Sequence, residues 1–229
     1  MKNLKLAAVC LSCLTMTGCS ALNFSVEGLI NAPKLTSEQS EIHQALIESV
    51  GSNITLKYPK NGEYRSAYVI ANIDDEPTDE AMVFYEYTSN GSEEDGLRVN
   101  ILDKDEDGKW YSVKELAGAG TDIDQVIISP MGSNNQTDVF VGYQNLTNDE
   151  KTMEIYSYTD GDFKRVALDT YSVLEPLDIN NDGYIELITI QRSTNNDTGA
   201  VTAKASMLNM KNNEITRGEN VDMLSLIQI

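Results

Sequence analysis

The pattern of apolar and polar positions along the chain changes at Gly51. Before it, Ile42, Ala45 and Leu46 recur at helical spacing, and Thr36-Ser-Glu-Gln39 has the spacing of a capping box. These features predict one amphipathic helix that begins at Thr36 and ends at Gly51. After Gly51, short alternating or β-branched runs are separated by Asn, Asp, Gly and Ser, which indicates a mainly β fold.

A loop that leads into an apolar run occurs twice, with an offset of 106 residues. Asn72–Glu80, followed by Ala-Met-Val-Phe, aligns without gaps with Asp178–Glu186, followed by Leu-Ile-Thr-Ile. Half of that offset predicts an intermediate copy. We place it at Pro130–Asp138, ahead of Val-Phe-Val.

Turn signals repeat with nearly the same period, at steps of 53 and 52 residues, and each follows an alternating strand pattern. The three turns are Asp107-Gly108, Asp160-Gly161 and Asn212-Asn213. Three positions after the first residue of each turn comes a large apolar side chain: Trp110, Phe163 and Ile215. A unit of about 50 residues with four short strands has the size and content of a propeller blade.

We therefore predict a partial β-propeller of about three four-stranded antiparallel blades, preceded by one short α-helix and a lead-in strand in residues 37–63. The expected blades span about 64–117, 118–168 and 169–220, and residues 221–229 are expected to begin a fourth. Propellers close with about four to eight blades. We expect the chain either to be cut short or to cover its open edge by oligomerising.

The N-terminus has the pattern of an export signal. Lys2 and Lys5 precede an apolar run, and Gly18 precedes Cys19, so residues 1–18 are excluded from the fold. Leu-Thr-Met-Thr-Gly-Cys resembles the lipobox of bacterial lipoproteins, which implies that Cys19 is acylated. By that resemblance, residues 19–36 form a lipidated tether on the outer face of the cytoplasmic membrane. The alternative is an ordinary secretory signal followed by a coincidental cysteine.

Charge and residue usage remove several classes of function. The formal net charge is −19 for the chain, and −21 without Lys2 and Lys5, so nucleic-acid binding is not expected. Attachment to a bilayer must then come from acyl groups. Cys10 and Cys13 leave with the signal, so no disulfide is expected. His43 is the only histidine, which argues against Ser-His-Asp catalysis and most zinc sites, and we expect it to be exposed to solvent.

The loop Asp178-Ile-Asn-Asn-Asp-Gly-Tyr-Ile-Glu186 carries alternating oxygen side chains and a glycine, as a hard cation such as Ca²⁺ requires. An EF-hand would need Glu at the twelfth position, which is Thr189, so that motif is excluded. The loop and its period resemble the VCBS and FG-GAP repeats of calcium-loop β-propellers. That resemblance implies a structural Ca²⁺ bound by the ligand set Asp178, Asn180, Asp182, Glu186 and the carbonyl of Tyr184. The alternative is an acidic turn that binds nothing and is satisfied by its own hydrogen bonds.

The other copies of the loop are weaker. The first keeps oxygen groups at Asn72, Asp74, Glu76 and Glu80, but Pro77 stands where the glycine is needed, so we expect a degenerate metal loop there. In the middle copy only Asp138 is charged, and no metal is expected.

The function expected from these features is that of a non-catalytic, membrane-anchored binding or interaction module with an unknown protein or glycan as ligand. Abundant tyrosine fits a binding surface, although tyrosine also packs well between strands. One alternative is a glycoside hydrolase or lyase that uses paired carboxylates, although no pair stands out. Another is a structural spacer domain.

Overall fold

The computed structural model describes residues 35–88, 96–131, 136–145, 150–194, 198–211, 214–218 and 221–223 of the 229-residue chain. The chain divides into two compact units, Met1–Ser37 and Glu38–Ile229. Nearly all described residues belong to the second unit. The predicted signal, Cys19 and most of the predicted tether lie outside the described residues.

The predicted helix is confirmed as α3 (Ser37–Val50). It buries Ile42, Ala45 and Leu46, and the Gly51 amide donates to the carbonyl of Ile47 at 2.9 Å. Gly51 has a φ of 85°, the left-handed conformation that commonly ends a helix. Among the described residues, no helix is long and apolar enough to span a bilayer.

The rest of the described chain forms antiparallel sheets. The first contains β1 (Ile54–Leu56), β2 (Tyr68–Ala71), β3 (Glu80–Tyr87), β4 (Leu97–Lys104) and β5 (Trp110–Ala117). The second contains β6 (Asp122–Ser129), β7 (Asp138–Gln144), β8 (Lys151–Thr159) and β9 (Asp162–Tyr171). The third contains β10 (Val173–Leu177), β11 (Glu186–Thr194), β12 (Val201–Lys211), β13 (Glu214–Arg217) and β14 (Val221–Met223).

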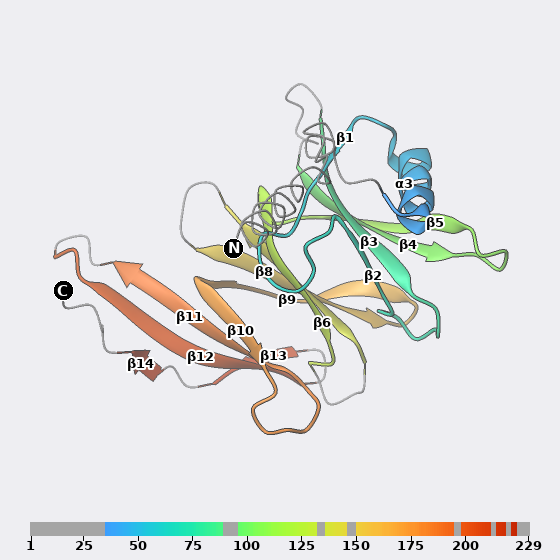
Figure 1. Cartoon of the computed structure of the whole chain (residues 1–229). Helices are drawn as coiled ribbons and strands as arrows, with labels where there is room; N and C mark the ends of the chain where they lie inside the picture. Colours follow the sequence, from blue (N-terminus) through green and yellow to red (C-terminus); the bar gives the residue numbers. More distant parts are fainter. Residues whose placement is uncertain are drawn as a thin grey trace, which may run out of the picture. The chain divides into compact units, whose positions relative to one another are not determined.

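The expectation of a mainly β fold that follows one helix is confirmed, with three antiparallel sheets of four or five strands. Strand order within each sheet largely follows chain order (Figure 1). In the first sheet, β1 and β2 pair with successive parts of β3, β2 with 80–83 and β1 with 85–87.

The expectation that residues 221–229 begin a fourth blade is wrong for residues 221–223, the part of this segment that the structure describes. Residues 221–223 form β14, which pairs with Ala203–Ala205 of β12 in the third sheet. The physical reason is strand length. Strand β12 is 11 residues long, and β13 pairs only with residues 208–211 of it. The first part of β12 can therefore pair with β14 along the same edge. Residues 224–229 lie outside the described residues.

Tight turns set the registers of the hairpins. Between β8 and β9, Asp160 (φ 55°) and Gly161 (φ 77°) form a two-residue connection with both residues in the left-handed region, as a type I′ turn requires. Gly108 (φ 76°) serves the longer connection between β4 and β5. The third predicted turn, Asn212-Asn213, lies outside the described residues.

Each sheet has a loop that is closed in the same way. The carboxylate at the start of β3, of β7 and of β11 accepts a hydrogen bond from the backbone amide seven residues earlier. The pairs are Ile73 N to Glu80 (2.8 Å), Met131 N to Asp138 (3.1 Å) and Ile179 N to Glu186 (2.9 Å). These are the loops that the sequence alignment places in correspondence, including the middle one.

The same carboxylate serves as a reference for the two faces of each sheet. The residue two positions after it points to one face, which we call the front face. The opposite face is the back face. The residues on the front faces are Met82, Phe140 and Ile188, and those on the back faces are Ala81, Val139 and Leu187. The core between the first two sheets joins the front of the first to the back of the second, through Met82 and Val139. The core between the last two joins Phe140 to Leu187.

Helix α3 covers the back face of the first sheet (Figure 1). Ile42 and Leu46, both 0% exposed, pack with Ala81, Val83 and other residues of that face. Full burial of a large aliphatic side chain contributes about 1.5–3 kcal/mol. The back faces of the second and third sheets are each covered by the sheet before them. On the first sheet, α3 takes that place.

The expectation that His43 is exposed is wrong. Its side chain is partly buried, and its Nδ1 atom is 2.8 Å from the hydroxyl of Tyr68 on β2. His43 lies beside the apolar stripe of α3, so packing of that stripe on the sheet brings it against β2. Burial raises the pKa of Tyr68 to about 12, which keeps the phenol protonated.

Candidate functional site

The predicted calcium loop connects β10 to β11 and is held by side chain to backbone hydrogen bonds. The amides of Asp182 and Gly183 donate to the two carboxylate oxygens of Asp178, at 3.1 and 3.0 Å. The amide of Tyr184 donates to Asp182 at 2.9 Å. Asn181 (φ 64°) and Gly183 (φ 88°) adopt the left-handed conformation that turns the chain around these contacts. The loop is therefore shaped by its own acidic side chains.

Three of the predicted ligands converge. The Nδ2 atom of Asn180 lies 2.9 Å from Oδ2 of Asp182 and 3.4 Å from Oε1 of Glu186. This amide is a donor between two carboxylates, the position in which a cation would also be stabilised. Asp178 is engaged by backbone amides instead. The described residues contain no cluster of three or more His, Cys, Asp or Glu side chains arranged around a metal position. The oxygen donors fit Ca²⁺, and the internal hydrogen bonds of the alternative acidic turn are also present.

The first loop is built differently. The amide nitrogen of Asn72 donates to the carbonyls of Glu76 and Thr78, so it does not face Glu80 as Asn180 faces Glu186. Asp74 accepts from the amide of Glu76 at 2.7 Å. These contacts use up the Asn72 amide and one oxygen of Asp74 within the loop itself. The degenerate metal loop expected here remains a prediction.

Glu80 is the most perturbed carboxylate of that loop. It is 1% exposed, and its Oε1 atom is buried without a hydrogen-bond partner. Desolvation raises its pKa to about 7, the hydrogen bond from Ile73 opposes this, and the nearby charges of Asp74 and Asp103 add to the increase. Asp103 on β4 was not singled out by the sequence. A raised pKa suits a general acid, but a side chain buried to this degree is out of reach of a substrate.

The carboxylate of the middle loop, Asp138, is fully buried. It accepts from the amide of Met131 and from the hydroxyl of Ser157 on β8. The lack of a metal there remains a prediction.

A cleft of about 560 Å³ lies between β6 and β10, the first strands of the second and third sheets. The segment that leads to β2 forms a third wall. Two backbone hydrogen bonds hold the ends of the cleft together: Asn61 N to the carbonyl of Asp124 (2.7 Å) and Ile185 N to the carbonyl of Pro130 (2.9 Å). Its lining residues are Asn61–Tyr64, Asp124–Ser129, Lys151, Ser172–Pro176 and Ile185. This volume is within the range of small-molecule sites.

Asp124 is the centre of a polar network at one end of this cleft. It is 2% exposed, and it lies at a β-bulge where the pairing of β6 with β7 skips from Ile123 to Gln125. A bulge re-aims a side chain, and it turns this carboxylate toward three donors. They are Lys151 Nζ (2.7 Å), Tyr171 OH (2.7 Å) and Asn61 Nδ2 (2.8 Å).

The network sets the charge of Asp124. Burial alone would raise the pKa of this carboxyl, but hydrogen bonds from Lys151, Tyr171 and Asn61 outweigh burial, and the pKa is lowered. Gly142 on β7 makes the geometry possible, because a Cβ atom there would lie 2.1 Å from the hydroxyl of Tyr171. Both Asp124 oxygens are occupied by donors, so this carboxylate anchors the network and is not free to act on a substrate.

Sequence reasoning did not find Asp124. The signal available was the pair of polar residues Asp124 and Gln125, which stands between Ile123 and the apolar run 126–128. Its partners lie 27, 47 and 63 residues away along the chain, so nothing in local spacing connects them.

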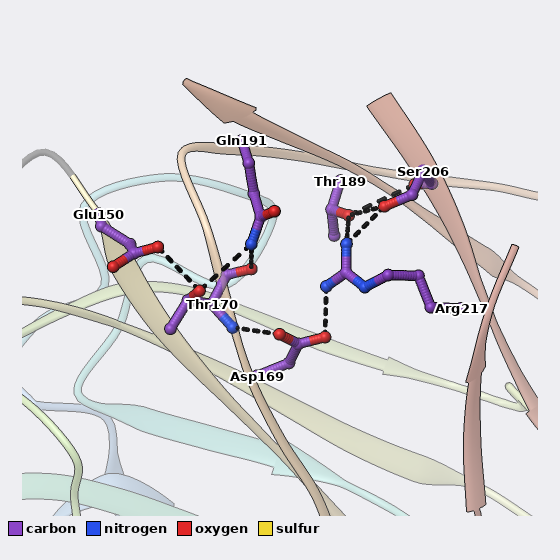
Figure 2. Close-up of polar contacts among 7 residues, drawn as sticks. All are labelled: Glu150, Asp169, Thr170, Thr189, Gln191, Ser206 and Arg217. Carbon is purple, nitrogen blue, oxygen red and sulfur yellow. Dashed lines mark hydrogen bonds and ion pairs between the residues drawn. The ribbon is translucent and has the colours of Figure 1, made fainter. Parts of the chain in front are cut away.

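A second polar network joins the second and third sheets (Figure 2). Arg217 on β13 reaches across to Asp169 on β9 and also donates to Thr189 and Ser206 on the third sheet. Gln191 donates to Thr170, and Thr170 donates to Glu150 at 2.9 Å. The contact between these sheets therefore combines an apolar core with a polar edge.

Comparison with protein families, with curated proteins and with solved structures finds no match to this chain. The resemblance to VCBS and FG-GAP repeats consequently stands on the nine-residue loop Asp178–Glu186 and on the period of the strands.

Proposed function

We propose that this chain is an exported, lipid-anchored bacterial protein whose β-propeller-like domain is stabilised by calcium and binds a protein or glycan ligand without catalysis. The observation that carries the binding function is the cleft between β6 and β10. Its lining residues include the apolar residues Val126, Ile128 and Leu174 and the polar residues Gln125 and Lys151. Apolar walls with a few placed polar groups are typical of ligand sites.

Three features support a propeller arrangement. Each sheet is mostly a meander, and successive sheets pack front to back. The first strands of the second and third sheets, β6 and β10, share one cleft with the segment that leads to β2 of the first sheet. The inner strands of propeller blades line a common channel in this way.

Calcium binding is proposed at Asp178, Asn180, Asp182, Glu186 and the carbonyl of Tyr184. The support is the convergence of Asn180, Asp182 and Glu186, with backbone amides holding Asp178. Calcium would neutralise the two facing carboxylates and hold the turn between β10 and β11. Extracellular modules bind it at about 10⁻⁴ to 10⁻³ M.

Calorimetric titration with Ca²⁺ tests this role. We expect heat of binding and a higher melting temperature with the native chain, and neither with Asp182→Asn. Asp107→Asn, in an exposed turn of the first sheet, is the matched control and should leave both unchanged. Absence of binding at 10 mM Ca²⁺, which is about ten times the weakest constant of such modules, would refute the proposal.

The binding function is tested on glycan and peptide arrays. Ser129→Tyr places a large side chain in the cleft and should weaken any binding at least tenfold. Thr202→Tyr, on an exposed position of β12, should not. If Ser129→Tyr and Thr202→Tyr bind the ligand equally well, the ligand site does not lie in the cleft. Turnover of any bound glycan would contradict the non-catalytic reading.

The anchor is tested by metabolic labelling with palmitate. Label is expected on the native chain and not on Cys19→Ser, which should also be released from the membrane fraction. Label that persists in the Cys19→Ser variant would place acylation elsewhere.

A further inference from the structure

Among the described residues, the packing of the sheets leaves one sheet face outside every core. The front face of the first sheet is covered by the second sheet, and that of the second by the third. The corresponding residue of the third sheet, Ile188, belongs to none of the cores formed by the described residues. Neither does Ile190, which lies two residues further on the same face.

The registers of β10, β11 and β12 define this surface row by row. Residues that are paired across strands share a face of the sheet. The central row is Val173, Ile190 and Ala205, the row on one side is Glu175, Ile188 and Met207, and the row on the other side is Arg192 and Ala203. The surface is therefore apolar in its middle, with one acid and one base on opposite sides.

The charged residues of this face lack ion pairs in the part of the chain that is described. Glu175 and Arg192 are both exposed, and neither takes part in an ion pair among the described residues. By contrast, Arg217 on the opposite face is paired with Asp169. The front face thus presents a partly exposed apolar centre and two exposed charges that no ion pair of the described residues uses.

A head-to-tail arrangement of copies is blocked. It would place this front face on the back face of another first sheet, but α3 already covers that face with Ile42, Ala45 and Leu46. A two-fold arrangement, in which the same surface meets itself, is the remaining way for two copies to cover it.

The rows are self-complementary under such a two-fold axis. We place the axis along the central row, across the strands, so that Ile190 of one copy lies over Ile190 of the other. The two outer rows then exchange places. Met207 of one copy faces the small Ala203 of the other, and Arg192 comes beside Glu175 of the other. Each dimer therefore contains two Met207–Ala203 contacts, and in two places Arg192 lies over Ile188 of the other copy, one strand away from its Glu175.

We propose that two copies of this chain associate through the front faces of their third sheets, with Ile190 and Ala205 at the centre and Arg192 paired with Glu175 of the second copy. This dimer follows from the strand registers and is independent of the calcium and ligand proposals. The interface makes the protein bivalent for any ligand of the cleft.

Cross-linking in membranes that contain the full chain tests the dimer. Ile190→Cys and, independently, Ala205→Cys place a thiol next to its own copy across the axis. With a short bismaleimide, both should yield a covalent dimer of twice the chain mass. Val113→Cys on β5, which is 51% exposed and outside the surface, is the control and should remain a monomer.

Charge reversal makes the test specific. Arg192→Glu should lower the cross-linked fraction at least tenfold, and adding Glu175→Arg should restore it. Met207→Asp should abolish it, with circular dichroism showing that the sheets are intact. A monomer with both cysteine variants, a product of another mass, or a dimer that is indifferent to Met207→Asp and to the charge pair would overturn the proposal.

Discussion

Replacement of Glu80 by Gln should stabilise the protein at alkaline pH but not at acid pH. Glu80 accepts one hydrogen bond from Ile73, and its other oxygen is buried without a partner. Ionisation of this carboxyl in the folded state is therefore unfavourable. Glutamine has nearly the same shape as the protonated acid and cannot ionise.

The magnitude follows from the raised pKa. Burial raises the pKa of Glu80 from 4.5 to about 7, so the folded protein holds this proton more tightly than the unfolded chain does. Stability from this group is complete below pH 4.5 and is lost as the pH rises through 7. At about 1.36 kcal/mol per pKa unit, the loss at pH 8 is about 3 kcal/mol at most. The Glu80→Gln variant escapes that loss.

Urea denaturation at pH 5 and pH 8, with chelator present, measures the difference. We expect the stability of Glu80→Gln relative to the native chain to rise by about 2–3 kcal/mol between these pH values. Glu186→Gln is the matched control, because Glu186 makes the same backbone contact with Ile179 but is partly exposed. The reasoning would be refuted if the stability of Glu80→Gln relative to the native chain did not change with pH. It would also be refuted if that change were the same for Glu186→Gln.

Three further substitutions test the packing and the polar networks. Asp124→Asn leaves Lys151 without its carboxylate partner and should cost about 2–4 kcal/mol in urea denaturation at pH 7. Because the pKa of Asp124 is lowered, its contribution is present above the unfolded value and is lost as the pH falls through the folded one, so the cost should shrink in acid. Gly142→Ala forces the new methyl group against the hydroxyl of Tyr171 and should cost at least about 1–3 kcal/mol, measured by thermal unfolding. Arg217→Met removes one of the polar links between the second and third sheets and should speed hydrogen exchange in β11 and β12.

Controls exist for these variants within the same chain. Lys164→Met breaks an exposed ion pair with Asp160 and should change stability by less than about 0.5 kcal/mol. A Cβ atom at Gly199 would have no neighbouring atom within 4 Å. Any loss of stability in Gly199→Ala would therefore reflect only the left-handed φ of 69° at this residue. An effect of Arg217→Met no larger than that of Lys164→Met would show that the network is not a link between sheets.

Local sequence pattern was sufficient to predict the helix and to identify which loops of the chain correspond to one another. The helical spacing of Ile42, Ala45 and Leu46 predicted α3, and the alignment of Asn72–Glu80 with Asp178–Glu186 predicted loops that close with the same hydrogen bond. These features depend on residues within a few positions of one another, so periodicity and turn chemistry reveal them.

Pairings between distant segments were decided only by the tertiary structure. The strand at 221–223 was assigned to a fourth blade, although it completes the edge of β12, because nothing in its own sequence states which strand it pairs with. His43 was expected to face water, and its partner Tyr68 lies on another element. Asp124 has three partners from three different segments.

The sequence by itself determined the mainly β fold, the helix that precedes it and the oxygen-rich loop before β11. The tertiary structure decided which carboxylates are buried, which are paired, and which sheet face is left uncovered. The physical reason is that hydrophobic periodicity depends on neighbours in the chain, whereas desolvation and charge pairing depend on neighbours in space. In stacked antiparallel sheets these spatial neighbours come from strands that are tens of residues apart.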